Sequence, residues 1–240
     1  MISVIIPTLN EERSLEGTLK SLRQCKKHTL EIIVSDGRST DGTALIAKKY
    51  ADKVLIYRGE KRQTIAAARN SGAAAALGEY LVFLDADVII RQPDLFFDKM
   101  LEAFSTRKNL VAANCFLKIL PDQATRADRI FSTIFNYLFM AQNNFLPIGA
   151  ASGEFQMIKR EAFKRVDGFR EDLAAGEDFD LFRRLTKIGK TRTITSLSVF
   201  HTGRRVHQVG WVRLMLTWFR DTVWLFLFDR TYSKVWEEVR

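Results

Sequence analysis

Short apolar runs alternate with helix-like segments along the first half of the chain. Strand-like segments occupy residues 2–7, 31–36, 54–57 and 80–84, the first of them a continuous apolar run. Helical patterns follow at Leu15, Leu19 and Leu22, from Asp41-Gly42-Thr43 onward and over 64–77. Asn10 is predicted to cap the first helix, with Glu11 and Glu12 in its positively polarised first turn. Continuous apolar runs of this length fit buried parallel strands, and strands alternating with helices indicate βαβ units. The pattern predicts an α/β fold with a mostly parallel sheet flanked by helices.

The second half of the chain is less regular but carries the same kinds of element. A helix is predicted over 127–145, a strand over 154–158, a helix over 177–188 and a last strand over 192–200. We expect these elements to extend the same α/β domain, because neither a linker nor an internal repeat divides the chain.

The end of the chain is rich in aromatic residues. All four tryptophans lie at or beyond Trp211, and Trp211–Phe228 is largely apolar. Its polar members at helical spacing on one stripe are Arg213, Thr217, Arg220 and Asp221. Because charges in hydrocarbon are costly, we expect an amphipathic helix in a membrane interface, with Trp and Phe toward lipid and Arg toward water. The alternative is an apolar face packed on the rest of the chain or on a second subunit of a homodimer.

Composition and charge place the chain among folded proteins that attract anions. Of its 240 residues 47% are hydrophobic and 27% charged, and the formal net charge is +9. A basic balance attracts nucleic acid, an anionic membrane or phosphorylated small molecules, but no long Lys/Arg run points to nucleic acid. Cys25 and Cys115 are too few for a zinc site or a disulfide framework. The N-terminus lacks the features of a secretory signal, so we expect a cytoplasmic protein.

Polar clusters follow three of the predicted strands, at residues 8–11, 36–41 and 85–87. Ligands of open parallel sheets bind beyond the carboxyl ends of the strands, so the clusters predict a binding site at that edge. Asp85 and Asp87 follow a strand at positions i and i+2, which point to the same side. Two converging carboxylates favour Mg²⁺ or Mn²⁺, which bind such groups together with phosphate oxygens and water. A solvated turn rich in Asp is the alternative.

Five motifs occur in the order found in one enzyme family. They are 3–12 (SVIIPTLNEE), 32–43 (IIVSDGRSTDGT), 68–70 (ARN), 80–87 (YLVFLDAD) and 176–180 (GEDFD). Together they closely resemble glycosyltransferase family 2, the inverting group with the GT-A fold, over roughly residues 1–203. The resemblance implies transfer of a sugar from a nucleotide-diphosphate sugar to a hydroxyl of a saccharide or lipid-linked acceptor. We expect a catalytic domain over 1–205 and a helical tail over 206–240.

The resemblance also implies roles for individual residues. The positions that match donor- and nucleotide-binding residues are Pro7, Thr8, Asn10, Glu11, Asp36, Arg69, Asp85 and Ala86. Asp36 matches an acid that contacts the base or the ribose, and Arg69 matches an arginine near the diphosphate. The family often has two adjacent acids after the second strand, where this chain has Asp36 followed by Gly37 and Arg38. The pattern therefore leaves the nucleotide base open, with UDP favoured and GDP and dTDP as alternatives.

The resemblance assigns the divalent metal to Asp85 and Asp87. His201 is added as a third candidate ligand, because a late histidine completes the metal shell in several relatives and neutral imidazole binds Mn²⁺. Arg204 and Arg205 come next in the chain, and a guanidinium matches phosphate in a bidentate fork, so both are predicted to clamp the diphosphate. Their alternative role is surface charge or attraction to a membrane.

Glu177 and Asp178 match the Glu-Asp pair of the family, in which the Asp usually serves as catalytic base. Transfer with inversion is one in-line displacement, so the acceptor hydroxyl must lose its proton as it attacks the anomeric carbon. A positioned carboxylate is the usual base for that step. Favourable charge at a helix N-terminus is the alternative role of the pair.

Two other functions fit parts of the pattern. Nucleotidyl transfer also uses paired acids on a parallel sheet, but its first loop is usually rich in Gly and basic residues, unlike residues 7–11. A basic nucleic-acid-binding module leaves the aligned acids unexplained. The sequence therefore favours a metal-dependent glycosyltransferase, cytoplasmic and peripheral on the inner face of the cell membrane, with anionic lipid rather than nucleic acid as its partner.

Overall fold

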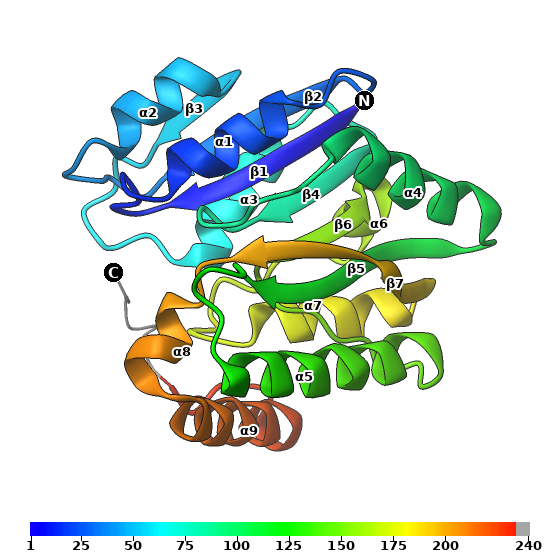
Figure 1. The fold of residues 1–240 in the computed structure, drawn as a ribbon. Coiled ribbons are helices and arrows are strands. Elements are labelled where there is room, and N and C mark those ends of the chain that lie inside the picture. Colours follow the sequence, from blue (N-terminus) through cyan, green and yellow to red (C-terminus); the bar gives the residue numbers. More distant parts are fainter. Residues whose placement is uncertain (234–240) are drawn as a thin grey trace.

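A seven-stranded sheet forms the centre of the molecule in the computed structural model, which describes residues 1–233 (Figure 1). Its strands are β1 (Ile2–Thr8), β2 (Leu30–Asp36), β3 (Lys53–Ile56), β4 (Tyr80–Leu84), β5 (Leu110–Ile119), β6 (Phe155–Lys159) and β7 (Lys190–His201), in the spatial order β3-β2-β1-β4-β6-β5-β7. β6 is antiparallel to β4 and β5, and the other neighbours are parallel. The predicted α/β fold with a mostly parallel sheet is confirmed.

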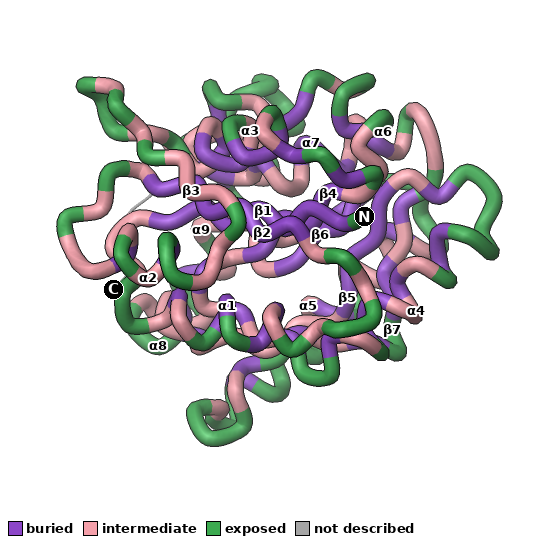
Figure 2. The backbone as a smooth tube through the Cα atoms, turned by 90° about the horizontal axis from the view of Figure 1, so that it is seen from above, coloured by how far each residue is buried: buried purple, intermediate pink, exposed green. Residues whose placement is uncertain are grey.

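Helices cover both faces of the sheet (Figure 2). They are α1 (Leu15–Arg23), α2 (Thr43–Tyr50), α3 (Ile65–Ala75), α4 (Pro93–Thr106), α5 (Arg126–Asn144), α6 (Arg160–Arg165), α7 (Glu177–Thr186), α8 (Arg204–Val209) and α9 (Trp211–Phe228). α1, α2 and α4 share one apolar core, and α3, α6 and α7 share the other. In β1, Val4 and Ile6 belong to the first core and Ile5 to the second. Because both faces of this strand are covered, its middle residues Val4, Ile5 and Ile6 are apolar at consecutive positions.

The pattern did not predict α4, α6, α8 or β5. The sequence of β5 reads poorly as a buried strand because Asn114 lies in its middle. The Asn114 side chain is buried, and its amide donates to Ala150 O at 2.9 Å. A buried polar group is tolerated when it is hydrogen-bonded, and here the partner is supplied by a segment far away in the chain.

The prediction that Asn10 caps the first helix is wrong. α1 begins at Leu15, and Asn10 has a left-handed backbone with φ of 55°. Its side-chain oxygen accepts a hydrogen bond from Thr40 N at 2.8 Å, so it ties the loop after β1 to the loop after β2. Glu11 lies in that loop and outside the first turn of α1, and its backbone N donates to Thr43 Oγ1 at 2.7 Å.

α9 lies along α5 at one edge of the molecule (Figure 1). Trp211 stacks on Phe131 with ring centroids 5.1 Å apart, and Trp218 meets Phe135 edge to face at 5.5 Å. Aromatic contacts of this kind add to the gain from burying the rings. The aromatic-rich helical tail predicted from the sequence is therefore present, and part of its apolar surface packs on protein.

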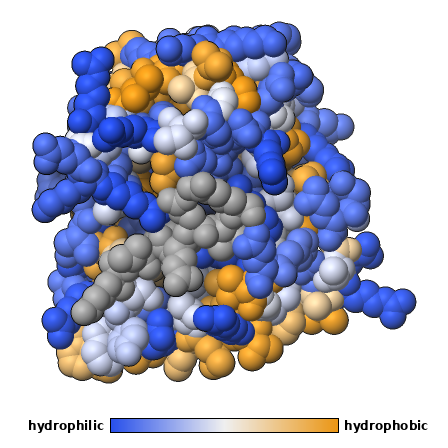
Figure 3. Space-filling model, turned by 90° about the vertical axis from the view of Figure 1, so that its left-hand side faces the viewer, coloured by the Kyte–Doolittle hydropathy of each residue, from blue (hydrophilic) through white to orange (hydrophobic). Residues whose placement is uncertain are grey.

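The predicted polar stripe of α9 is wrong at Asp221. This carboxylate is buried and accepts hydrogen bonds from the backbone N and the hydroxyl of Ser233, at 3.0 and 2.7 Å. On the opposite face α9 exposes a row of apolar side chains: Val212, Leu216, Phe219, Val223 and Leu227. Figure 3 shows apolar side chains gathered along the lower edge of the molecule, where α9 lies in Figure 1.

Within the described residues 1–233, no helix is long and apolar enough to cross a membrane. Trp236 and the rest of 234–240, which belong to the predicted tail, lie outside the described residues. The division of the chain at residue 205 stays a prediction.

Candidate active site

The carboxyl ends of β1, β2 and β4 meet at one edge of the sheet, as their parallel pairing requires. Thr8 Oγ1 donates to Asp36 Oδ1 there at 3.0 Å, and Ser39 N donates to Asp36 Oδ2 at 2.9 Å. This buried carboxylate thus ties β1 to the loop after β2. A Cβ on Gly37 would lie 3.3 Å from Thr8 O, so this tight approach disfavours a second acid after Asp36. The base or ribose contact of Asp36 stays a prediction.

The guanidinium of Arg69, on α3, is wholly buried and joins three carboxylates. Its Nη1 donates to Glu177 Oε1 at 2.9 Å and to Asp178 Oδ1 at 2.8 Å. Its Nη2 donates to Asp85 Oδ1 at 3.0 Å, and its Cζ lies 5.3 Å from the ring centroid of Phe169. Four residues from three separate sequence motifs therefore form one cluster, with Asp85 at the end of β4 and the Glu-Asp pair at the start of α7.

Two residues of this cluster were not predicted. Gln156, on β6, donates from Nε2 to Asp178 Oδ1, and Gly153 O accepts from Arg69 Nη2 at 3.3 Å. A Cβ on Gly153 would lie 2.4 Å from Arg69 Nη2, too close for any side chain. The same Cβ position is 3.1 Å from Asp85 Oδ2 and 3.3 Å from Asp178 Oδ2, so both oxygens face Gly153. The sequence signal was a glutamine between the apolar residues Phe155 and Met157 of a predicted strand.

The cluster holds more acid than base, because three carboxylates share one guanidinium. Burial, which disfavours a charged carboxylate, raises the pKa of Asp178 to about 8 and the pKa of Asp85 to about 7. The charge of Arg69 opposes both shifts, and neighbouring carboxylates add to them. A positive charge brought to Asp85 would relieve this repulsion.

Asp87 belongs to a second polar cluster, formed with the segment after β7. Thr202 Oγ1 donates to Asp87 Oδ2, and Arg204 Nε lies 3.5 Å from the same oxygen. Arg204 Nη2 also donates to Glu11 Oε1 at 2.6 Å, which joins α8 to the loop after β1. Burial raises the pKa of Glu11, and the hydrogen bond from Arg204 opposes the rise. Thr202 was not predicted, since 115 positions separate it from Asp87.

The other predicted residues lie next to these clusters in the chain. The ring of His201 accepts a hydrogen bond through Nδ1 from the backbone N–H two residues later, at 3.2 Å. Ala86 is buried between the two aspartates, Pro7 lies within β1, and Arg205 lies on α8. In the part of the chain that the structure describes, no three His, Cys, Asp or Glu side chains are grouped closely enough to hold a metal ion. Metal binding by His201 stays a prediction.

Comparison with known proteins identifies the family. The model of glycosyl transferase family 2 matches residues 3–167, more than half of the chain, and the chain belongs to this family. The succinoglycan biosynthesis protein ExoA from Rhizobium meliloti is 29% identical over 203 residues, which are 78% of this chain and 58% of that protein. An uncharacterized glycosyltransferase from Haemophilus influenzae is 28% identical over 236 residues, which are 94% of this chain and 86% of that protein. The chain spans only 58% to 67% of several curated relatives.

Solved structures share the fold. A mannosyltransferase from Pyrobaculum calidifontis in complex with GDP-Man and Mn²⁺ matches with a TM-score of 0.66 at 23% identity, over 84% of this chain and 56% of that one. Glucosyl-3-phosphoglycerate synthase from Mycobacterium tuberculosis, in complex with Mn²⁺, UDP and phosphoglyceric acid, matches with a TM-score of 0.64 at 23% identity, over 95% and 77% of the chains. These likenesses confirm the GT-A fold predicted from the sequence.

The surplus of acid around Arg69 predicts a stability effect that depends on pH. The pKa of Asp178 is raised from its ordinary 3.8 to about 8 in the folded chain, so the folded state loses stability as the pH rises through this interval. Asp178→Asn keeps an oxygen for Arg69 but carries no charge. The melting temperature of the variant minus that of the wild type should therefore increase as the pH rises from 5 to 9, by roughly several degrees.

Thermal unfolding at several pH values measures this effect. Asp122→Asn, on an exposed carboxylate of the loop before α5, is the matched control and should show no such trend. A difference between Asp178→Asn and the wild type that stays constant with pH would contradict the prediction.

Proposed function

We propose that this chain is an inverting glycosyltransferase that moves a sugar from a nucleotide-diphosphate sugar, UDP-linked in preference to GDP- or dTDP-linked, to a hydroxyl of a saccharide or lipid-linked acceptor. The observation that carries the proposal is the buried guanidinium of Arg69, which joins Asp85 to Asp178. Membership of the family favours sugar transfer over nucleotidyl transfer and nucleic-acid binding. Structures of similar fold have been solved with UDP-GlcNAc, UDP or GDP-Man.

The donor set around Asp85 and Asp87 fits a divalent cation. Both side chains offer the oxygen ligands that Mg²⁺ and Mn²⁺ prefer, and Asp85 belongs to a cluster with more acid than base. Asp85 Oδ1 is held by Arg69, whereas Asp85 Oδ2 is directed toward Gly153. A bound cation supplies positive charge against the leaving diphosphate. Arg204, beside Asp87, adds a guanidinium that binds phosphate oxygens in the same place.

Asp178 is the base of this proposal. Its Oδ1 is held by Arg69 and Gln156, and its Oδ2 faces Gly153. An acceptor hydroxyl that approaches over Gly153 meets Asp178 Oδ2, which takes the proton as the oxygen bonds to the anomeric carbon and the nucleotide diphosphate leaves. Asp85 Oδ2 faces the same residue. In this proposal, the carboxylate that binds the cation beside the leaving diphosphate and the carboxylate that takes the proton of the acceptor therefore both face a residue without a side chain.

Asp87→Ala tests the metal part of the proposal. The change removes one of two carboxylate ligands, so the Mn²⁺-dependent part of UDP or GDP binding should be lost, while metal-free binding changes little. Calorimetry of the nucleotide with and without Mn²⁺ measures it. Asp122→Ala, the same substitution at an exposed site, is the control. Metal-enhanced binding equal to that of the wild type would overturn the assignment of Asp87.

Asp178→Asn tests the base. Nucleotide binding should persist while turnover falls by about 10²–10⁴-fold, the usual contribution of a positioned base. Because the pKa of Asp178 lies at about 8, its charged form increases as the pH rises, and wild-type turnover should rise through that pH while the variant shows no such rise.

Release of sugar from a panel of nucleotide sugars, with water as acceptor, measures the turnover of Asp178→Asn and its pH profile. Glu177→Gln is the comparison, since Glu177 contacts the same guanidinium. Wild-type turnover in Asp178→Asn together with a loss in Glu177→Gln would move the role of base to Glu177.

The exposed apolar face of α9 fits the surface of a membrane. Its row of side chains recurs every three or four positions, and Phe219 is 70% exposed. The neighbouring helix α5 adds Ile130, Ile134 and Leu138, each about half exposed. Arg213 and Arg220 on α9 are exposed too and complement anionic lipid. On this proposal the enzyme lies peripherally on the inner face of the cell membrane, with its apolar face in the interface.

Liposome flotation tests the membrane contact. The wild type should float with anionic vesicles more than with neutral ones and less at high salt, because each basic residue near such a surface contributes about 1 kcal/mol. Leu216→Glu with Phe219→Glu places two charges on the apolar row and should abolish flotation. Leu45→Glu, on α2 and 73% exposed, is the matched control. A wild type that floats with neither vesicle would contradict membrane binding and direct attention to a homodimer interface.

A further inference from the structure

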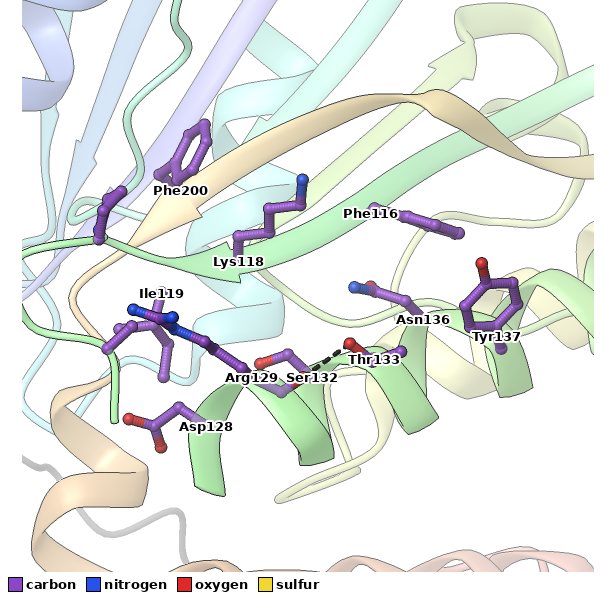
Figure 4. A pocket seen from close by; sticks show the side chains of 12 residues that line it. Phe116, Lys118, Ile119, Asp128, Arg129, Ser132, Thr133, Asn136, Tyr137 and Phe200 are labelled. Carbon is purple, nitrogen blue, oxygen red and sulfur yellow. Dashed lines mark hydrogen bonds between the residues drawn. The ribbon is translucent and has the colours of Figure 1, made fainter. Parts of the chain in front are cut away.

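A groove of about 420 Å³ lies between α5 and the ends of β5 and β7 (Figure 4). Phe116 and Ile119 line it from β5, Tyr137 lines it from α5, and Phe200 lines it from β7. The rings of Phe116 and Tyr137 pack edge to face with centroids 5.6 Å apart. The groove therefore has an aromatic and aliphatic wall that is open to solvent.

The polar lining of this groove is positively charged. Lys118 and Arg129 line it and are exposed. The acid among its lining residues is Asp128, whose carboxylate accepts from Trp211 Nε1 at 2.7 Å and bonds His207 Nε2 at 2.9 Å. Because Asp128 is already bound to these side chains, the two cations remain for a ligand. An apolar wall beside two cations suits an anion joined to a hydrophobic chain.

One end of the groove meets the candidate active site. Phe200 O accepts a hydrogen bond from Ile89 N at 2.7 Å, which ties β7 to the turn that carries Asp87. Two residues after Phe200, Thr202 donates its hydroxyl to Asp87. A ligand in the groove therefore lies beside the proposed donor site.

The other side of the groove meets the exposed apolar face. Thr133 and Tyr137 line the groove on α5, and a helix turns about 100° per residue. Ile134 and Leu138 therefore follow next around the helix, and both are exposed. The exposed apolar residues of α5 therefore lie next to the groove, on the surface assigned to the membrane.

We infer that this groove binds a lipid diphosphate, the anchored end of a lipid-linked acceptor. Lys118 and Arg129 contact the phosphates, and the first units of the hydrocarbon chain lie against Phe200 and Tyr137. The chain then leaves along the apolar face of α5 into the membrane. The inference rests on the proposed sugar transfer and specifies its acceptor, and the groove is the site that holds this acceptor next to Asp87.

Binding of farnesyl diphosphate, a short water-soluble lipid diphosphate, tests the groove. Intact protein is titrated in EDTA, which removes any metal-dependent binding of a diphosphate at the donor site. Farnesyl diphosphate should bind at least tenfold more tightly than inorganic pyrophosphate or farnesol, because both parts of the molecule are contacted. Lys118→Glu and Arg129→Glu should each weaken it at least tenfold, and Tyr137→Ser should weaken it while leaving pyrophosphate unaffected. Lys48→Glu, an equal charge change on the exposed surface of α2, should bind as the wild type does.

Three results would overturn the inference. One is equal affinity for farnesyl diphosphate and pyrophosphate, which would mean a site for free phosphate. Another is undiminished binding in Lys118→Glu together with Arg129→Glu. The third, measured in a separate titration without EDTA, is displacement of the probe by UDP with Mn²⁺, which would place it at the donor site. The titration contains no sugar donor, so failure of the groove leaves sugar release from nucleotide sugars to be judged separately.

Discussion

The guanidinium of Arg69, buried among three carboxylates, constrains the rest of the site. A charge removed from water must be paired and hydrogen-bonded, and Arg69 has partners at the end of β4 and at the start of α7. Breaking a buried pair by removing one partner costs about 3–5 kcal/mol, so the arrangement is costly to disturb. Arg69 therefore fixes Asp85 and Asp178, which come from segments far apart in the chain, at a constant separation before any substrate binds.

The same constraint explains why residue 153 is a glycine. Any Cβ there would collide with the guanidinium and cover Asp85 Oδ2 and Asp178 Oδ2. Arg69 occupies the Oδ1 atoms of both aspartates and leaves their Oδ2 atoms directed to one place. The surplus of carboxylate destabilises the folded chain at neutral pH, but it also provides the negative charge that a cation and a proton require. Stability and the proposed chemistry therefore oppose each other at this cluster.

Local pattern was enough to predict the part of the fold that carries the motifs. β1, β2 and β4 are rich in apolar residues because they are covered on both faces, and Asp85 could be placed because it directly follows the apolar run of β4. The sequence was misleading where a side chain is used by a distant segment. Asn10 resembles a helix cap, yet its side-chain oxygen accepts a hydrogen bond from Thr40 N. Gln156 and Thr202 belong to the site because they donate hydrogen bonds to Asp178 and Asp87. Such contacts are set by strand order, and the position of β6 beside β4 has no signature in the sequence of either strand.

α5 shows how one helix can link the proposed site to a membrane. Its buried polar residues Asn136 and Asn143 hold β5 and β7, through hydrogen bonds to Leu117 and Thr193. Phe131 and Phe135 pack on α9, and the remaining sides line the groove or face outward as apolar surface. These hydrogen bonds hold α5 in one rotation about its axis. The orientation of the groove and of the outward apolar face is therefore fixed relative to the strands that end at the site. An acceptor held by its lipid in that interface would present its head group to Asp178 from a fixed direction. Part of the entropy cost of bringing acceptor and donor together would then be met when the acceptor binds at the membrane, before the transition state is reached.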